Sequence, residues 1–138
     1  MSYPIKITGL DHLVLRTANL EEMILFYKQV LGCHVERTVI NSGLYQLRAG
    51  SCLIDLVDTS TKHGQRGGRP TGTNDTNLDH FCLRVDPWDE LAIFTHLAEF
   101  NFTKTDIVQR YGADGMGPSV YIKDPDGNKV ELKGPSTI

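Results

Sequence analysis

The sequence predicts an α+β fold in which one βαβββ module occurs twice. The octet LDHLVLRT at residues 10–17 returns at residues 78–85 as LDHFCLRV. Each octet precedes a segment with helical spacing of apolar residues, and each half later carries a strand-like segment with one carboxylate between aliphatic residues, at 53–57 and at 129–133. An internal repeat of this kind indicates two similar structural units in one chain.

The elements of the first half follow from local patterns. Alternating residues predict a strand over residues 6–17, and Asn19 suits a helix N-cap with Glu22 three residues later, as in a capping box. Apolar residues then form one helical stripe that ends before Gly32, a residue typical of a helix C-terminus. The remaining strands are expected near residues 35–39, 44–48 and 52–58.

The second half repeats this order. A strand is expected at 78–85 and a helix at 88–99, and strands follow near residues 105–109, 119–123 and 129–133. Asp124-Pro125-Asp126-Gly127 predicts a hairpin turn between the last two. The glycine-rich stretch 112–117 resembles a flexible pocket rim. We expect a single domain over 1–138, made of modules 5–60 and 77–134 and joined by a loop at 61–76.

Composition narrows the class of protein. A chain of 138 residues can bury the core of one ordinary domain. Its net charge of -3 gives no reason to expect nucleic acid or anionic membrane as a partner. No apolar run approaches the roughly 20 residues of a membrane span, and the N-terminus lacks the pattern of a secretory signal. Three cysteines without metal-type spacing indicate reduced thiols. We therefore expect a cytoplasmic protein that acts on a small molecule.

Strand alternation places four polar residues on one side of the predicted sheets. Successive side chains point to opposite faces, so His12 and His80 lie opposite the apolar residues of their strands, as do Asp55 and Glu131. A lone strand histidine is usually structural. Four such residues at matched places of a repeat instead favour a shared divalent-metal site. Two imidazoles with one or two carboxylates suit Zn, Fe, Ni or Mn rather than Ca.

The segment SVYIKDPDGNKVEL at residues 119–132 carries the pattern Asp-Pro-Asp-Gly, three residues, Glu-Leu. With the repeated histidine strand, it resembles the vicinal oxygen chelate superfamily, the glyoxalase/bleomycin-resistance/extradiol-dioxygenase fold, over about residues 5–133. The resemblance implies homodimers and curved mixed sheets around a metal-binding cavity, with His12, His80 and Glu131 as ligands. The fourth family position, Glu or Gln in glyoxalase I members, falls on Asp55. This shorter side chain would bind the metal, act through water or orient a neighbour.

The glyoxalase members imply a metal-dependent lyase or isomerase acting on vicinal oxygens. One Ni, Zn, Fe, Mn or Co ion would act as a Lewis acid, and Glu131 or Asp55 would move the proton. Arg16 matches the position of the arginine with which glutathione-dependent members hold their co-substrate, so the substrate could be a glutathione hemithioacetal. The asparagine that those enzymes place after the first-module carboxylate is missing at 56–59. Arg16 could equally be a surface arginine or half of an ion pair.

Other family members imply other functions. An extradiol ring-cleaving dioxygenase would use His12, His80 and Glu131 as an iron-binding facial triad. Tyr45 or Tyr121 would then be its acid/base residue.

Fosfomycin-modifying members resemble the chain around Ser119 and Tyr121, which makes these two residues candidates for substrate binding. Those members carry an arginine beyond the last strand, and no arginine follows Glu131 here. A bleomycin-resistance-like binder, which sequesters a drug without turnover, lacks the metal residues that this chain carries.

Overall fold

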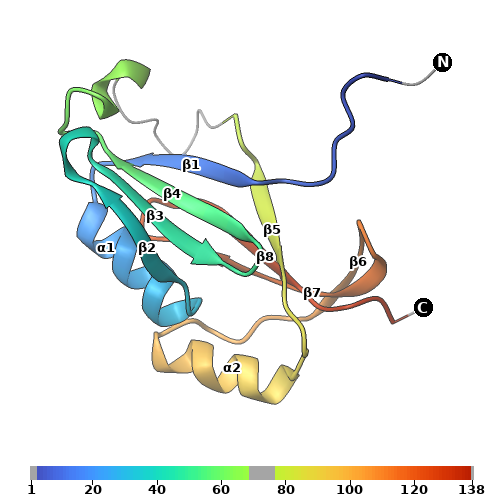
Figure 1. Cartoon of the computed structure of the whole chain (residues 1–138). Coiled ribbons are helices and arrows are strands. Elements are labelled where there is room, and N and C mark those ends of the chain that lie inside the picture. The colour runs from blue at the N-terminus through green and yellow to red at the C-terminus, as the bar shows by residue number, and fades with distance from the viewer. Residues whose placement is uncertain (1–2, 69–76, 138) are drawn as a thin grey trace. The chain divides into compact units, whose positions relative to one another are not determined.

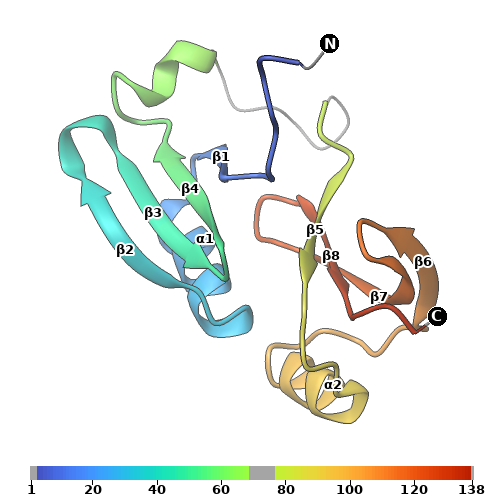
Figure 2. The same cartoon turned by 45° about the vertical axis from the view of Figure 1, so that its right-hand side comes forward.

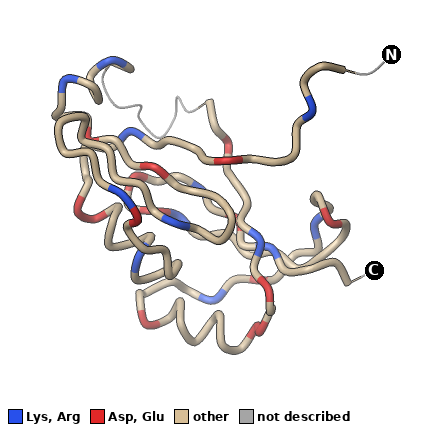
Figure 3. The backbone as a smooth tube through the Cα atoms, viewed as in Figure 1, with Lys and Arg blue, Asp and Glu red and all other residues tan. Residues whose placement is uncertain are grey.

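The computed structural model describes residues 3–68 and 77–137. The chain divides between residues 70 and 71 into two compact units. Each unit contains an α-helix after its first strand and a four-stranded mixed sheet, in the order βαβββ (Figures 1 and 2). The predicted α+β class and the twofold occurrence of the module are therefore confirmed. Basic and acidic residues are interspersed along both units (Figure 3).

The first unit is a mixed sheet in the order β1-β4-β3-β2, with β1 parallel to β4 and the other pairs antiparallel. Its elements in chain order are β1 (His12–Thr17), α1 (Leu20–Leu25), the π-helical turn η1 (Phe26–Val30), β2 (His34–Val39), η2 (Ile40–Ser42), β3 (Leu44–Ala49), β4 (Cys52–Asp58) and η3 (Gly64–Gly67).

The core of the first unit forms where α1 contacts β4. Met23 and Tyr27 from the helical segment are fully buried, as are Leu47, Ile54 and Leu56 from the sheet. Because Ile54 and Leu56 alternate with Asp55 along β4, burying the aliphatic pair turns the carboxylate to the opposite face.

Two local predictions for this unit were only partly right. Asn19 is the N-cap residue of α1, as predicted, but its side chain makes no capping hydrogen bond; its backbone N–H donates to Thr17 Oγ1 at 2.9 Å. The first strand begins at His12 and not near residue 6, because its parallel partner β4 begins only at Cys52 and the pairing starts with His12 opposite Leu53. Gly32 does end the helical segment, and its φ of 73° is the left-handed conformation that glycine adopts readily.

The second unit has the sheet order β5-β8-β7-β6, with β5 parallel to β8. Its elements are β5 (His80–Arg84), α2 (Glu90–Glu99), β6 (Val108–Gly112), β7 (Gly115–Lys123) and β8 (Lys129–Lys133). The Asp89 side chain caps α2 by accepting the N–H of Ala92 at 3.0 Å. None of the helices in the described parts of the chain has the length and hydropathy needed to cross a bilayer.

The turn predicted between the last two strands is confirmed. Buried Asp124 accepts the backbone N–H groups of Asp126 and Asn128 at its Oδ1, at 3.0 and 2.9 Å. The N–H of Gly127 donates to the Asp124 carbonyl at 2.9 Å. One carboxylate thus holds the hairpin that delivers β8, the strand of Glu131, to the sheet.

The glycine-rich stretch 112–117, predicted as a flexible pocket rim, forms a β-hairpin. Gly112 ends β6 and pairs with Gly115 at the start of β7, and residues 113 and 114 form the tight turn between them. The strand predicted at 105–109 accordingly lies at Val108–Gly112. The predicted loop 61–76 contains η3, and its residues 69–76 lie outside the described part of the chain.

Candidate functional site

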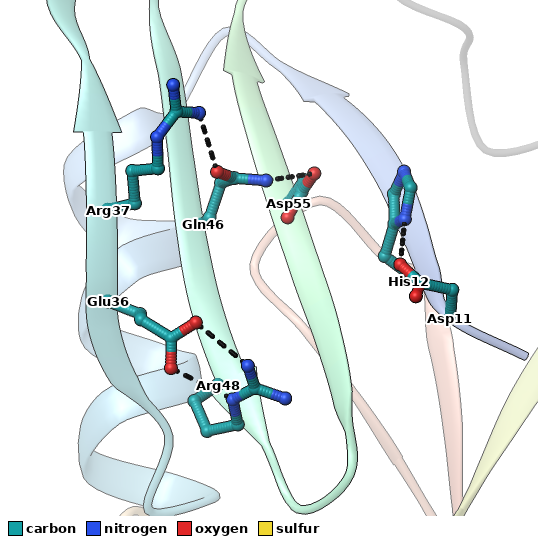
Figure 4. Close-up of polar contacts among 7 residues, drawn as sticks. All are labelled: Asp11, His12, Glu36, Arg37, Gln46, Arg48 and Asp55. Carbon is teal, nitrogen blue, oxygen red and sulfur yellow. Dashed lines mark hydrogen bonds and ion pairs between the residues drawn. The ribbon is translucent and has the colours of Figure 1, made fainter.

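In the first unit, strand register brings His12 and Asp55 to one face of the sheet. His12 pairs with Leu53 and Val14 pairs with Asp55, so His12 and Asp55 lie on the same face of the sheet (Figure 4). The buried Ile54 lies on the opposite face. Asp55 is only 3% exposed, whereas the His12 side chain is 46% exposed. This face therefore presents an accessible imidazole near a buried carboxylate.

The two oxygens of Asp55 have different surroundings. Its Oδ2 accepts a hydrogen bond from Gln46 Nε2 at 3.1 Å. Its Oδ1 is buried and has no hydrogen-bond partner among the described residues. Because buried polar atoms are nearly always paired, an unpaired carboxylate oxygen indicates a place for a cation, a proton donor or a water molecule.

In the second unit, Glu131 lies between neighbours on both sides in the sheet. It pairs with Cys82 of β5 and with Tyr121 of β7. The buried Ser119 hydroxyl donates to Glu131 Oε2 at 2.6 Å, and His80 Nε2 lies 3.1 Å from Oε1. Burial disfavours the charged carboxylate, but hydrogen bonding by Ser119 and Tyr121 and the charge of His80 outweigh it. The pKa of Glu131 therefore lies below its usual value.

Each histidine also contacts the aspartate that precedes it. His12 Nδ1 lies 2.7 Å from Asp11 Oδ1, and His80 Nδ1 lies 2.7 Å from Asp79 Oδ2. A neutral imidazole that donates from Nδ1 keeps its lone pair on Nε2, the arrangement typical of metal-binding histidines with an outer carboxylate. The hydrogen bond to Asp11, helped by the charge of Asp55, also raises the pKa of His12.

Asp11 and Asp79 were not predicted as site residues, although the sequence carries a signal for them. Both copies of the octet place aspartate directly before histidine. In the second unit, His80 contacts a carboxylate from each of its ring nitrogens, Asp79 at Nδ1 and Glu131 at Nε2. A neutral imidazole can donate to one of these carboxylates. Contact of one imidazole with both carboxylates requires either a second ring proton or a metal ion in place of that proton.

The predicted substrate-binding residues have partners within their own units. Arg16 Nε donates to the Gly64 carbonyl at 3.0 Å, and Nη2 donates to the carbonyl of Gly68. Arg16 thus holds the backbone around η3. The Ser119 hydroxyl is engaged by Glu131.

The tyrosines differ in their location. The Tyr121 hydroxyl accepts a hydrogen bond from Arg110 Nε at 3.3 Å. The Tyr121 ring packs edge-on against the His80 ring, with 5.8 Å between the ring centroids. Tyr121 is therefore next to the His80–Glu131 pair. Tyr45 pairs with Leu56, on the face that carries the buried core of the first unit, and so lies away from the His12 face.

The donor types fit a borderline divalent metal. Each unit offers one imidazole Nε2 and one carboxylate, a donor pair that suits Zn, Fe, Ni, Mn or Co, and Asp55 Oδ1 is unpaired. No group of three or more His, Cys, Asp or Glu side chains close enough to hold a metal occurs within residues 3–68 and 77–137. The binding of one metal ion by all four predicted ligands together stays a prediction.

Comparison with known proteins identifies the family. The model of the Glyoxalase/Bleomycin resistance protein/Dioxygenase superfamily matches residues 9–132. The chain belongs to this superfamily. Its members generally use a divalent metal, typically bind small-molecule substrates and often form dimers. Membership confirms the resemblance read from the repeat and from the segment at 119–132.

Several relatives align over nearly the whole chain. The virulence protein STM3117 of Salmonella typhimurium is 29% identical over 126 residues, which cover 91% of this chain and 83% of that protein. A structure from the mobile metagenome of V. Pseudocholerae has a TM-score of 0.79 at 27% identity, covering 98% of this chain and all of that chain (100%). The structure of lactoylglutathione lyase from Agrobacterium tumefaciens has a TM-score of 0.63 at 22% identity. The match covers 93% of the present chain and 94% of the lyase chain. This last likeness shows the shared fold alone.

Proposed function

We propose that this protein is a divalent-metal-dependent lyase or isomerase of the glyoxalase type, acting on a small substrate with vicinal oxygens. The observation that carries the proposal is the repeated set of an aspartate, a histidine and a carboxylate, once in each unit. In this proposal His12, Asp55, His80 and Glu131 together bind one Ni, Zn, Fe, Mn or Co ion.

The chemistry divides between the metal and the two carboxylates. A bound divalent ion supplies Lewis acidity, which stabilises negative charge on two adjacent substrate oxygens. Glu131 is held by Ser119 and has a lowered pKa, so it is ionised near neutral pH and can accept a proton. Asp55 is the second candidate proton carrier because its Oδ1 has no hydrogen-bond partner in the described residues.

The proposed substrate class is broader than that of an enzyme that acts only on glutathione adducts. The fold shared with a lactoylglutathione lyase makes a glutathione hemithioacetal the first compound to test. However, Arg16 already donates to the carbonyls of Gly64 and Gly68, which argues against its use as a glutathione anchor. Tyr121, which lies against His80, is the better placed candidate for substrate contact. We further propose that the protein is a cytoplasmic homodimer.

The first experiment measures bound metal in the full chain after stripping and reloading with Ni²⁺, Co²⁺, Mn²⁺, Zn²⁺ or Fe²⁺. His80→Ala and Glu131→Gln are expected to lose most of the ion, and Asp55→Ala is expected to lose less if aspartate acts through water. His34→Ala, at an exposed histidine of β2, is the matched control and should bind metal like the wild type. Unchanged stoichiometry in both His80→Ala and Glu131→Gln rejects the site.

The second experiment tests the reaction class. A lyase should turn over methylglyoxal plus glutathione, or a related vicinal-oxygen substrate, without oxygen. Stoichiometric oxygen uptake with a catechol in the Fe²⁺ form would instead establish the dioxygenase alternative. Drug binding without turnover, by a protein unable to bind metal, would support the sequestering alternative.

A further inference from the structure

A line of polar contacts crosses three strands of the first unit and ends at Asp55 (Figure 4). Arg37 of β2, Gln46 of β3 and Asp55 of β4 are paired in register across the sheet. Arg37 Nη1 donates to Gln46 Oε1 at 3.0 Å, and Gln46 Nε2 donates to Asp55 Oδ2 at 3.1 Å. The exposed guanidinium is thereby connected to a buried carboxylate through one amide.

The chemistry of the three groups gives this line a direction. A guanidinium has only donors, so the Gln46 atom that faces Arg37 must be the carbonyl oxygen. The amide nitrogen of Gln46 must then face Asp55, where it can donate only to a carboxylate oxygen. The contact occupies Oδ2 and leaves Oδ1 buried without a hydrogen-bond partner in the described part of the chain.

An irregularity in β2 places Arg37 for this role. The register between β2 and β3 shifts between Val35 and Arg37, so Glu36 is an extra residue in the ladder. Bulges of this kind re-aim side chains and are over-represented beside active sites. Here the shift lets Arg37 oppose Gln46 while Glu36 contacts Arg48 (Figure 4).

We propose that Arg37 and Gln46 are positioning residues that fix the rotamer of Asp55, so that Oδ1 is the atom offered to a bound divalent ion. The inference rests on the proposed function for the identity of that ion. It assigns the two carboxylate oxygens different roles, one held by the protein and one kept for the ligand. Neither Arg37 nor Gln46 is itself a ligand.

A purely structural role, in which the contacts only tie the strands together, makes a different prediction. The Glu36–Arg48 ion pair joins the same two strands, with Arg48 Nη2 2.8 Å from Glu36 Oε2. Glu36 lies outside the hydrogen-bonded line to Asp55. Glu36→Gln is therefore the matched control, because it weakens a contact between strands without altering the surroundings of Asp55.

The test compares wild type, Gln46→Leu, Arg37→Leu and Glu36→Gln in two measurements. The first is the dissociation constant for Co²⁺, with the visible spectrum of the Co²⁺ form. The second, made on the metal-free protein, is the Asp55 χ1 rotamer from three-bond NMR couplings to Cγ. Outer partners of metal ligands typically change affinity by about 10- to 100-fold. Gln46→Leu is therefore expected to weaken Co²⁺ binding by about 10-fold or more and to release Asp55 into several rotamers.

Arg37→Leu should have a smaller effect in the same direction, because the Gln46 amide remains but is free to flip. Its site is exposed, so it keeps the test available if Gln46→Leu does not fold. Glu36→Gln should match the wild type in both measurements. An unchanged Asp55 rotamer and Co²⁺ affinity in Gln46→Leu would overturn the proposed positioning role of Gln46 and Arg37. A wild type that binds no Co²⁺ would contradict the proposed function instead, and the rotamer measurement alone would then test the positioning role.

Discussion

Removing the Ser119 hydroxyl should destabilise the protein through Glu131. Ser119 is fully buried, Glu131 is 6% exposed, and their hydrogen bond of 2.6 Å is short, as expected for a donor to a carboxylate. Hydrogen bonds to charged groups contribute about 1.5–3 kcal/mol to stability. Ser119→Ala is therefore expected to lower the free energy of unfolding by about this amount near neutral pH, because Oε2 stays buried after losing its donor.

The cost should depend on pH in a defined direction. The folded pKa of Glu131 lies below its ordinary value of 4.5. A lowered folded pKa contributes stability that is fully present above the unfolded value and is lost as pH falls through the folded value. The difference between wild type and Ser119→Ala should thus be constant from pH 7 to about pH 5 and shrink below about pH 4.5.

Urea unfolding of the metal-free protein between pH 3 and pH 7 measures this difference. Ser51→Ala, in the exposed turn between β3 and β4, is the control and should change stability by less than about 0.5 kcal/mol. A cost for Ser119→Ala no larger than that of the control at pH 7, or one that stays constant down to pH 3, would refute the reasoning.

Three further predictions concern the aspartates. Asp79→Ala should weaken Zn²⁺ binding by about 10-fold in calorimetry, since the outer carboxylate fixes the histidine tautomer, and equal affinity would contradict that role. Asp11→Asn should lower the pKa of His12 toward 6.5 in an NMR titration, because the hydrogen bond that His12 donates to Asp11 is the largest cause of its elevation; an unchanged titration would exclude this cause. Asp124→Ala should lower the free energy of unfolding in urea by about 2 kcal/mol or more, because two backbone N–H groups lose their acceptor. A loss below about 0.5 kcal/mol would show that the turn forms without the Asp124 carboxylate.

Local periodicity was sufficient to predict the order of helices and strands and the faces of the strands that carry the candidate site, although the bounds of some strands differ. Asp55 lies opposite Ile54 because successive strand side chains alternate, a geometry that needs no knowledge of the rest of the chain. The turn at Asp124 was equally predictable, because its contacts lie within four residues. The repeat added the correspondence between the two units, and with it the matched histidines.

The partners of individual atoms were decided by tertiary structure. Arg16 was a candidate substrate anchor because of its sequence spacing from His12. In the structure it donates to the carbonyls of Gly64 and Gly68 at η3, which lies far along the chain. Gln46 carried no sequence signal, and its role arises only because strand pairing places it between Arg37 and Asp55. Side-chain direction in a strand is a property of neighbouring residues. A hydrogen-bond partner across strands depends on register, bulges and burial, which arise when distant segments pack together.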